Sequence, residues 1–132
     1  MNRALDLSRS ELAAVVASKE SVIVKLRPAH VHESAGRCGV DPGRALSQDI
    51  DVTFGGARLV NGPAEMPARI GEGTLFVSGS AVAGPLPLPV RFKGQLLLRI
   101  VTGRGEELTV EAAWAESTLV GRATAAGEGG DA

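Results

Sequence analysis

Apolar and polar side chains alternate along most of the chain after residue 20. In Ser21–His32 every second residue up to Leu26 is apolar, and the same alternation runs from Asp49 to Phe54. A period of two places one set of side chains in a core and the other set toward water, which is typical of a half-buried β-strand. Both segments are therefore predicted to be strands.

The second half of the chain continues this pattern. Leu75–Ala83 predicts a further strand, and Val90–Val101 with Glu107–Ala115 predicts a hairpin, because the intervening Thr-Gly-Arg-Gly-Glu can supply the turn. A last short strand is expected near Ser117–Arg122. The candidate core residues of the hairpin are Phe92, Leu96, Leu98 and Ile100 in one arm and Leu108, Val110 and Trp114 in the other.

The N-terminal segment has a different period. Ser8 and Glu11 have the spacing of a capping box, and apolar residues follow at helical intervals. The sequence predicts a short amphipathic helix over Arg9–Lys19 that covers the sheet as a lid.

Two segments interrupt the alternation. Glu33–Ser47 contains several Gly and one Pro and is predicted to be a loop, and loops of that length usually have a function. Gly84–Pro89 has Pro at alternate positions, which cannot donate backbone hydrogen bonds, so we expect an extended connector along a sheet edge.

These elements predict a mainly β fold: an antiparallel sandwich, curled sheet or small barrel with one short N-terminal helix. The chain has 132 residues, which suits one domain. We assign 1–122 to a single β-rich domain. The last residues, 123–132, have no large apolar side chain and are predicted to form a disordered Gly/Ala tail.

Composition excludes several function classes. The formal net charge is −1, and the chain has one Trp, three Phe and no Tyr, so we predict no nucleic-acid partner. The one cysteine, Cys38, cannot form an intramolecular disulfide, and we see no secretory signal and no apolar run long enough for membrane insertion. We therefore expect a cytoplasmic protein.

His30-Val31-His32 is the sharpest chemical feature. Residues two apart on a strand point to the same face, where two imidazoles could bind a transition metal. Cys38 is the predicted third ligand, with further oxygen donors nearby in Glu33, Asp41 and Asp49. The simpler interpretation is that the two histidines lie on the surface at a strand end. A third hypothesis, that either histidine activates Cys38 as a nucleophile, is supported only by their proximity in the sequence.

The chain contains no catalytic constellation and no dinucleotide, P-loop or nucleophile-elbow motif. We predict a non-enzymatic binding or assembly module without a cofactor, which pairs with a protein partner or with itself as a homo-oligomer. Apolar residues on both faces at Leu96–Leu98 and Ala112–Trp114 need a second layer or a partner to cover them. In one version of this hypothesis the module binds an apolar small ligand under the predicted helix. The alternative hypothesis is a metal-dependent enzyme or sensor with its site at His30 and His32.

Overall fold

The computed structural model describes residues 2–38 and 41–125, and most of them belong to one antiparallel, curled sheet of ten strands. The elements in chain order are β1 (Asn2–Asp6), the 3-10 turn η1 (Leu7–Arg9), β2 (Glu11–Ala17), β3 (Ser21–Ser34), β4 (Gly43–Gly55), β5 (Arg58–Asn61), β6 (Ala68–Val77), β7 (Ser80–Ala81), β8 (Leu86–Pro87), β9 (Arg91–Thr102) and β10 (Glu107–Ala125). The structure has the predicted curled sheet, and part of this sheet closes on itself.

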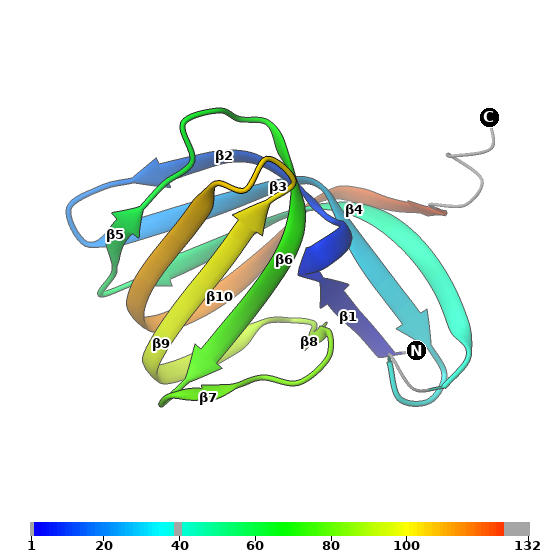
Figure 1. The fold of residues 1–132 in the computed structure, drawn as a ribbon. Helices are drawn as coiled ribbons and strands as arrows, with labels where there is room; N and C mark the ends of the chain where they lie inside the picture. Colours follow the sequence, from blue (N-terminus) through cyan, green and yellow to red (C-terminus); the bar gives the residue numbers. More distant parts are fainter. Residues whose placement is uncertain (1, 39–40, 126–132) are drawn as a thin grey trace.

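Six of the strands close into a ring (Figure 1). The order β2, β6, β9, β10, β4, β3 returns to β2, because β2 pairs with β6 at Glu11 and Leu12 and with β3 from Leu12 to Ala17. The alternating apolar positions of these strands face the inside of the ring. The largest fully buried side chains include Leu12, Leu26, Ile50, Ile70, Leu75, Ile100 and Leu108.

The strands β3 and β4 are longer than the ring and extend beyond it. On this extension β1 pairs with β3, and β8 pairs with β1 through Leu86 and Pro87. The short strand β8 ends the sheet, so the predicted place of the proline-rich connector at a sheet edge is confirmed. The outer half of the molecule is therefore made of β8, β1, β3, β4 and the end of β10 (Figure 1).

The predicted helix over Arg9–Lys19 is wrong. The only helical turn in this part of the described chain is η1, capped by the Asp6 side chain, which accepts a hydrogen bond from the Ser8 amide. The residues that follow form β2. Their apolar run suits either element, and the ring requires a strand there because β2 joins β3 to β6.

Two further boundaries differ from the prediction. The predicted strand Leu75–Ala83 is divided between β6 and β7 by a tight turn at Ser78 and Gly79, where both φ angles are positive, 49° and 84°. The predicted loop Glu33–Ser47 is much shorter, because β3 continues to Ser34 and β4 starts at Gly43.

The predicted hairpin is confirmed as β9 and β10, with one inward residue misassigned. Leu96 and Val110 are buried as expected, but Trp114 is 38% exposed. The register between β9 and β10 shifts after Ala112, and Ala115 takes the inward position in place of Trp114. The predicted short strand at Ser117–Arg122 is the continuation of β10.

The predicted tail starts too early. Ala123–Ala125 still belong to β10, and the rest of that prediction, 126–132, lies outside the described residues. No helix among the described residues is long and apolar enough to cross a membrane.

Candidate functional site

A groove of about 690 Å³ opens on the outer half of the molecule, between the proline-rich connector and the end of β10. We call it the β8–β10 groove. Its sides are the N-terminal residues of β1, the connector from Pro85 to Pro89, and β10 from Ser117 to Ala123, with Gly36–Cys38 at one end. The volume is in the range of sites that hold ligands or peptides.

The backbone of β10 is exposed along this groove. The pairing of β9 with β10 ends at Arg91 and Glu116, and Ser117 then donates its amide to the carbonyl of Val90 at 3.0 Å. Beyond Ser117, β10 pairs with β4 as far as Ala125, and no described strand pairs with its other side. We call this side of Thr118–Ala125 the open edge.

Leu119 is the central residue of the open edge. Backbone groups of successive strand residues alternate between the two edges, so the amide and carbonyl of Leu119 face the same side as those of Ser117. Its side chain lines the groove and is 55% exposed, more than any other exposed large apolar side chain among the described residues. The groove therefore offers a backbone donor and acceptor beside an uncovered apolar side chain.

Gln48 shapes the wall of the groove. The register between β10 and β4 shifts between Val120 and Thr124, where Gly121 has a φ of 72°. The buried Gln48 side-chain amide donates to the carbonyls of Val120 and Gly121 at 2.9 and 3.0 Å. Gln48 thus supplies the hydrogen bonds that the strand pairing loses at this bulge.

The charged side chains that line the groove are Arg3 and Arg37, and two carboxylates, Glu33 and Asp41, lie beside them. Glu33 is buried and receives hydrogen bonds from Arg3 at 2.7 Å and Arg44 at 2.8 Å. These two guanidinium groups, Arg3 first, hold the pKa of Glu33 below its ordinary value of 4.5. Arg37 at the groove end is exposed, and its guanidinium has no ion pair with any described residue.

Substituting Glu33 by Gln should lower stability at neutral pH and flatten its acid dependence. Because the folded-state pKa is lowered, the carboxylate stabilises the fold above pH 4.5, and this contribution is lost as pH falls below that value. Urea denaturation from pH 7 to pH 2.5 measures the effect. The control Glu107→Gln removes an exposed pair with Arg99 and should change the midpoint little. Equal midpoints for Glu33→Gln and wild type at pH 7 would contradict the ion-pair argument.

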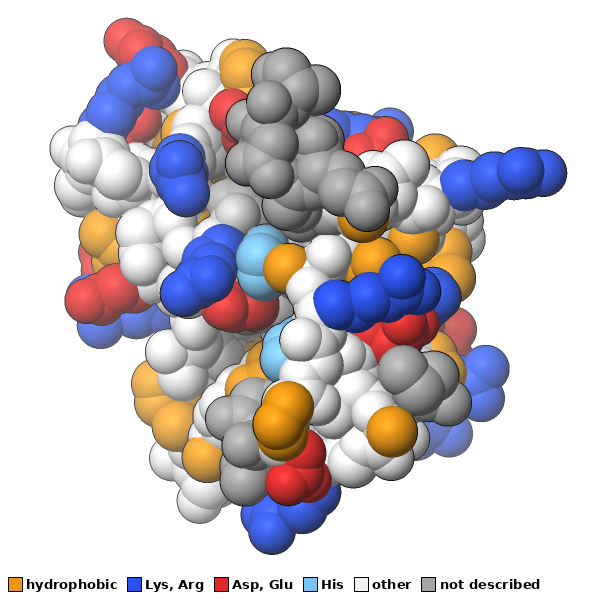
Figure 2. Space-filling view, turned by 90° about the vertical axis from the view of Figure 1, so that its right-hand side faces the viewer, with side chains coloured by type: hydrophobic (Ala, Val, Ile, Leu, Met, Phe, Trp, Pro, Cys, Tyr) orange, Lys and Arg blue, Asp and Glu red, His pale blue; other side chains and the backbone are white. Residues whose placement is uncertain are grey.

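The two histidines lie on the outer face of β3, as the sequence predicts. His30 is opposite Asp6 and Ser47, and His32 is opposite Ala4 and Ala45. Figure 2 shows both imidazoles (pale blue) on one side of the molecule, with basic and acidic side chains around them. Partial burial lowers the pKa of His30, and Asp6 opposes this shift.

Cys38 lies beside the backbone of this pair. Its thiol donates to the carbonyls of Asn2 at 3.3 Å and His32 at 3.5 Å. The Nε2 atom of His32 is buried without a hydrogen-bond partner among the described residues, and the ring lies against Gly43. Within 2–38 and 41–125, no three His, Cys, Asp or Glu side chains gather as a metal site would require, so Cys38 as third ligand stays a prediction.

The inside of the ring is filled. The enclosed space lined by residues such as Leu26, Phe54 and Leu98 measures about 10 Å³, which is less than a small ligand needs. The segment predicted to be a helical lid is the strand β2, so the hypothesis of an apolar ligand bound under that lid loses its site. The β8–β10 groove has room for a ligand.

Comparison of the chain with protein-family models, with curated proteins and with solved structures gave no match. Sequence analysis missed Leu119, Gln48 and Arg37 as site residues. The pattern places Leu119 on a strand, but its exposure depends on where β9 stops pairing with β10, which no local pattern encodes.

Proposed function

We propose that this protein is a non-enzymatic binding or assembly module, and that it binds an extended segment of a protein partner or of a second copy in the β8–β10 groove. The observation that carries this proposal is the open edge of β10 beside an apolar groove. Adding a strand to an exposed sheet edge is a common mode of peptide recognition, in which backbone pairing gives affinity and side-chain contacts give specificity.

The contrast between the two sides of the groove supports this proposal. Exposed edges invite aggregation, and proteins usually blunt them with Pro, charges or bulges. The β8 side has Pro85, Pro87 and Pro89, whereas the open edge has no Pro, and its bulge at Gly121 and its charge at Arg122 come after Thr118–Val120. A ligand strand is therefore expected to pair with β10, along the regular part of β10 before Gly121.

The variant Leu119→Pro tests this proposal. It removes the amide that faces the groove and spares the amides that pair with β4, so it should weaken strand addition roughly tenfold while the fold is retained. The control Val120→Ala trims a neighbouring exposed side chain and keeps the groove-facing amide of Leu119. The measurements are mass in solution over a range of concentrations and a selection of displayed random peptides on the wild-type protein.

Self-association, or peptide binding, that Leu119→Pro weakens by the expected factor and Val120→Ala retains would support the proposal. A monomer at every concentration, together with no selected peptide that is sensitive to Leu119→Pro, would refute it. Circular dichroism of both variants ensures that a loss of binding is not a loss of fold.

A metal-dependent enzyme or sensor is the second candidate, favoured by the two imidazoles on one face and the unpartnered Nε2 of His32. Metal binding requires neutral imidazole, which the lowered pKa of His30 favours. Elemental analysis of the purified protein and of the variant with both His30→Ala and His32→Ala tests this. Near-stoichiometric metal that the double variant loses would support the metal site, and equal metal content in both proteins would reject it.

A further inference from the structure

We propose that the β8–β10 groove selects an extended peptide in which an acidic residue is followed by apolar residues at alternate positions. This inference rests on the proposed strand addition and specifies the chemistry of the partner. It places the acidic side chain against Arg37 and the apolar side chains between Leu119 and the proline-rich connector.

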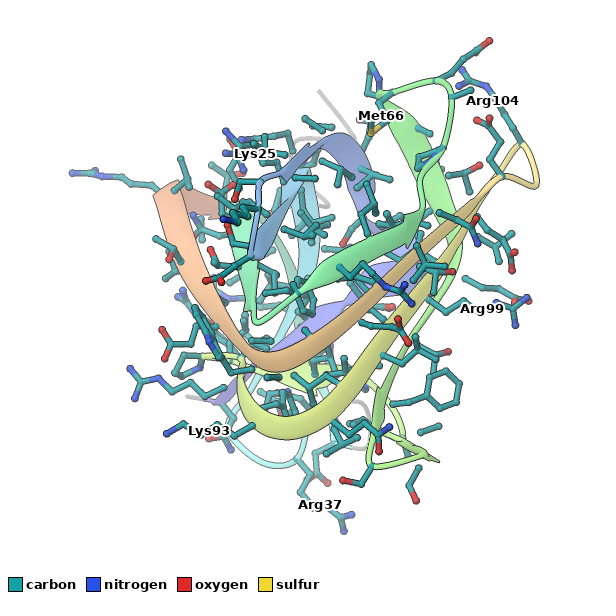
Figure 3. All side chains as sticks on the ribbon, turned by 90° about the vertical axis from the view of Figure 1, so that its left-hand side faces the viewer. Lys25, Arg37, Met66, Lys93, Arg99 and Arg104 are labelled. Atoms are coloured by element: carbon teal, nitrogen blue, oxygen red, sulfur yellow. The ribbon has the colours of Figure 1, made fainter. Side chains whose placement is uncertain are left out.

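The charges at the groove indicate an acidic ligand. Its charged lining residues are Arg3 and Arg37, and no Asp or Glu lines it. Arg3 already pairs with Glu33, whereas Arg37 has no ion pair among the described residues. Figure 3 shows Arg37 projecting outward at the lower end of that view. A carboxylate is the natural partner for a guanidinium at this position.

The remaining lining indicates alternate apolar residues. Val31 is buried at the base of the groove, Leu88 is half-buried, and Leu119 is largely exposed. In an added strand every second side chain points to the same face, so alternate apolar residues would cover Leu119. The other side chains of the peptide would point to water.

The position of Arg37 sets the order of the acidic and apolar residues in the peptide. The loop that carries Arg37 joins Ser34 to Gly43, and the end of β10 pairs with the start of β4 at Ala125 and Leu46. Arg37 is therefore at the C-terminal end of β10. A peptide that pairs antiparallel with β10 begins at this end, so its acidic residue precedes its apolar ones.

A second copy of the open edge fits the groove less well. Residues 117–125 contain no acidic side chain, and their one charge is Arg122, which would enter a basic groove. Like charges at an interface oppose association. We therefore assign the groove to a partner segment with an acidic residue.

Fluorescence anisotropy with three labelled peptides tests this inference. The first is acetyl-Asp-Ser-Val-Thr-Val-Thr-Val-amide, the second has Lys in place of Asp, and the third has Asp moved to the C-terminal end. Wild-type protein should bind the first roughly two- to fivefold more tightly than the others at low salt, and the difference should shrink at 1 M salt. The variant Arg37→Glu should reverse the preference between Asp and Lys.

The outcomes separate this inference from the proposed function. If all three peptides bind equally, Arg37→Glu has no effect and Leu119→Pro still weakens binding, the acidic preference is wrong and strand addition stands. If Leu119→Pro leaves binding of every peptide unchanged, strand addition itself is wrong. Dodecanoate binding that depends on Arg37 but not on the amide of Leu119 would also overturn the peptide assignment, in favour of an apolar carboxylate.

Discussion

Leu12→Ala is expected to destabilise the protein by about 2–5 kcal/mol, in the range of large-to-small core substitutions. Leu12 is fully buried in β2, where it pairs with Leu26 on one side and Ala68 on the other. Truncation leaves a cavity at the point where the ring of six strands closes. Urea denaturation followed by circular dichroism measures the loss.

The control for this prediction is Val16→Ala in the same strand. Val16 is 45% exposed, so its truncation should cost less than about 1 kcal/mol. In the helix predicted from the sequence, residues 12 and 16 would share one face and would be affected alike. In a regular strand these two residues would also share a face, and in β2 the register shift between Leu12 and Ala14 separates them. Similar costs for both variants would therefore contradict this shift.

Gly55→Val is expected to cost about 1–3 kcal/mol and to move the one tryptophan of the chain. Trp114 lies directly opposite Gly55 across β4 and β10, with its indole over the glycine. A Cβ atom at Gly55 would overlap Cε2 of Trp114, so the ring must leave. Because Trp114 is already 38% exposed, displacement should shift its fluorescence to longer wavelength.

Two further variants complete this experiment. Gly103→Ala is the matched control, because a Cβ atom there meets its nearest neighbour at 3.6 Å, an ordinary contact. In Trp114→Ala the clash is removed, so Gly55→Val should cost less in that background than in wild type. Additive effects of the two substitutions would show that the indole does not occupy the space over Gly55.

Alternation was enough to predict the fold class, since side-chain direction in a strand follows from local geometry. Val22, Val24 and Leu26 face the core of the structure as their spacing indicates. The segment that became β2 was mispredicted because Leu-Ala-Ala-Val-Val-Ala suits a helix or a strand, and tertiary pairing with β3 and β6 decides between them. Trp114 was misassigned because a register shift reverses alternation without a local signal.

Less of the candidate site could be predicted. The prolines of residues 85–89 predict an edge, since Pro cannot donate to a neighbouring strand, and β8 confirms it. The shared face of His30 and His32 follows from their spacing. The groove does not follow from any local pattern, because it forms where β9 stops pairing with β10 at Arg91 while β10 goes on pairing with β4.

The length of β3 and β4 has a consequence for recognition. These two strands pair continuously in both halves, from Ser21 with Gly55 to Ser34 with Gly43, apart from one irregularity near Pro28. The two residues that these strands contribute to the groove, Val31 and Gln48, are thus on strands that the closed core already holds in place. A ligand then meets a pre-organised surface, so little of its binding free energy is spent on ordering the protein.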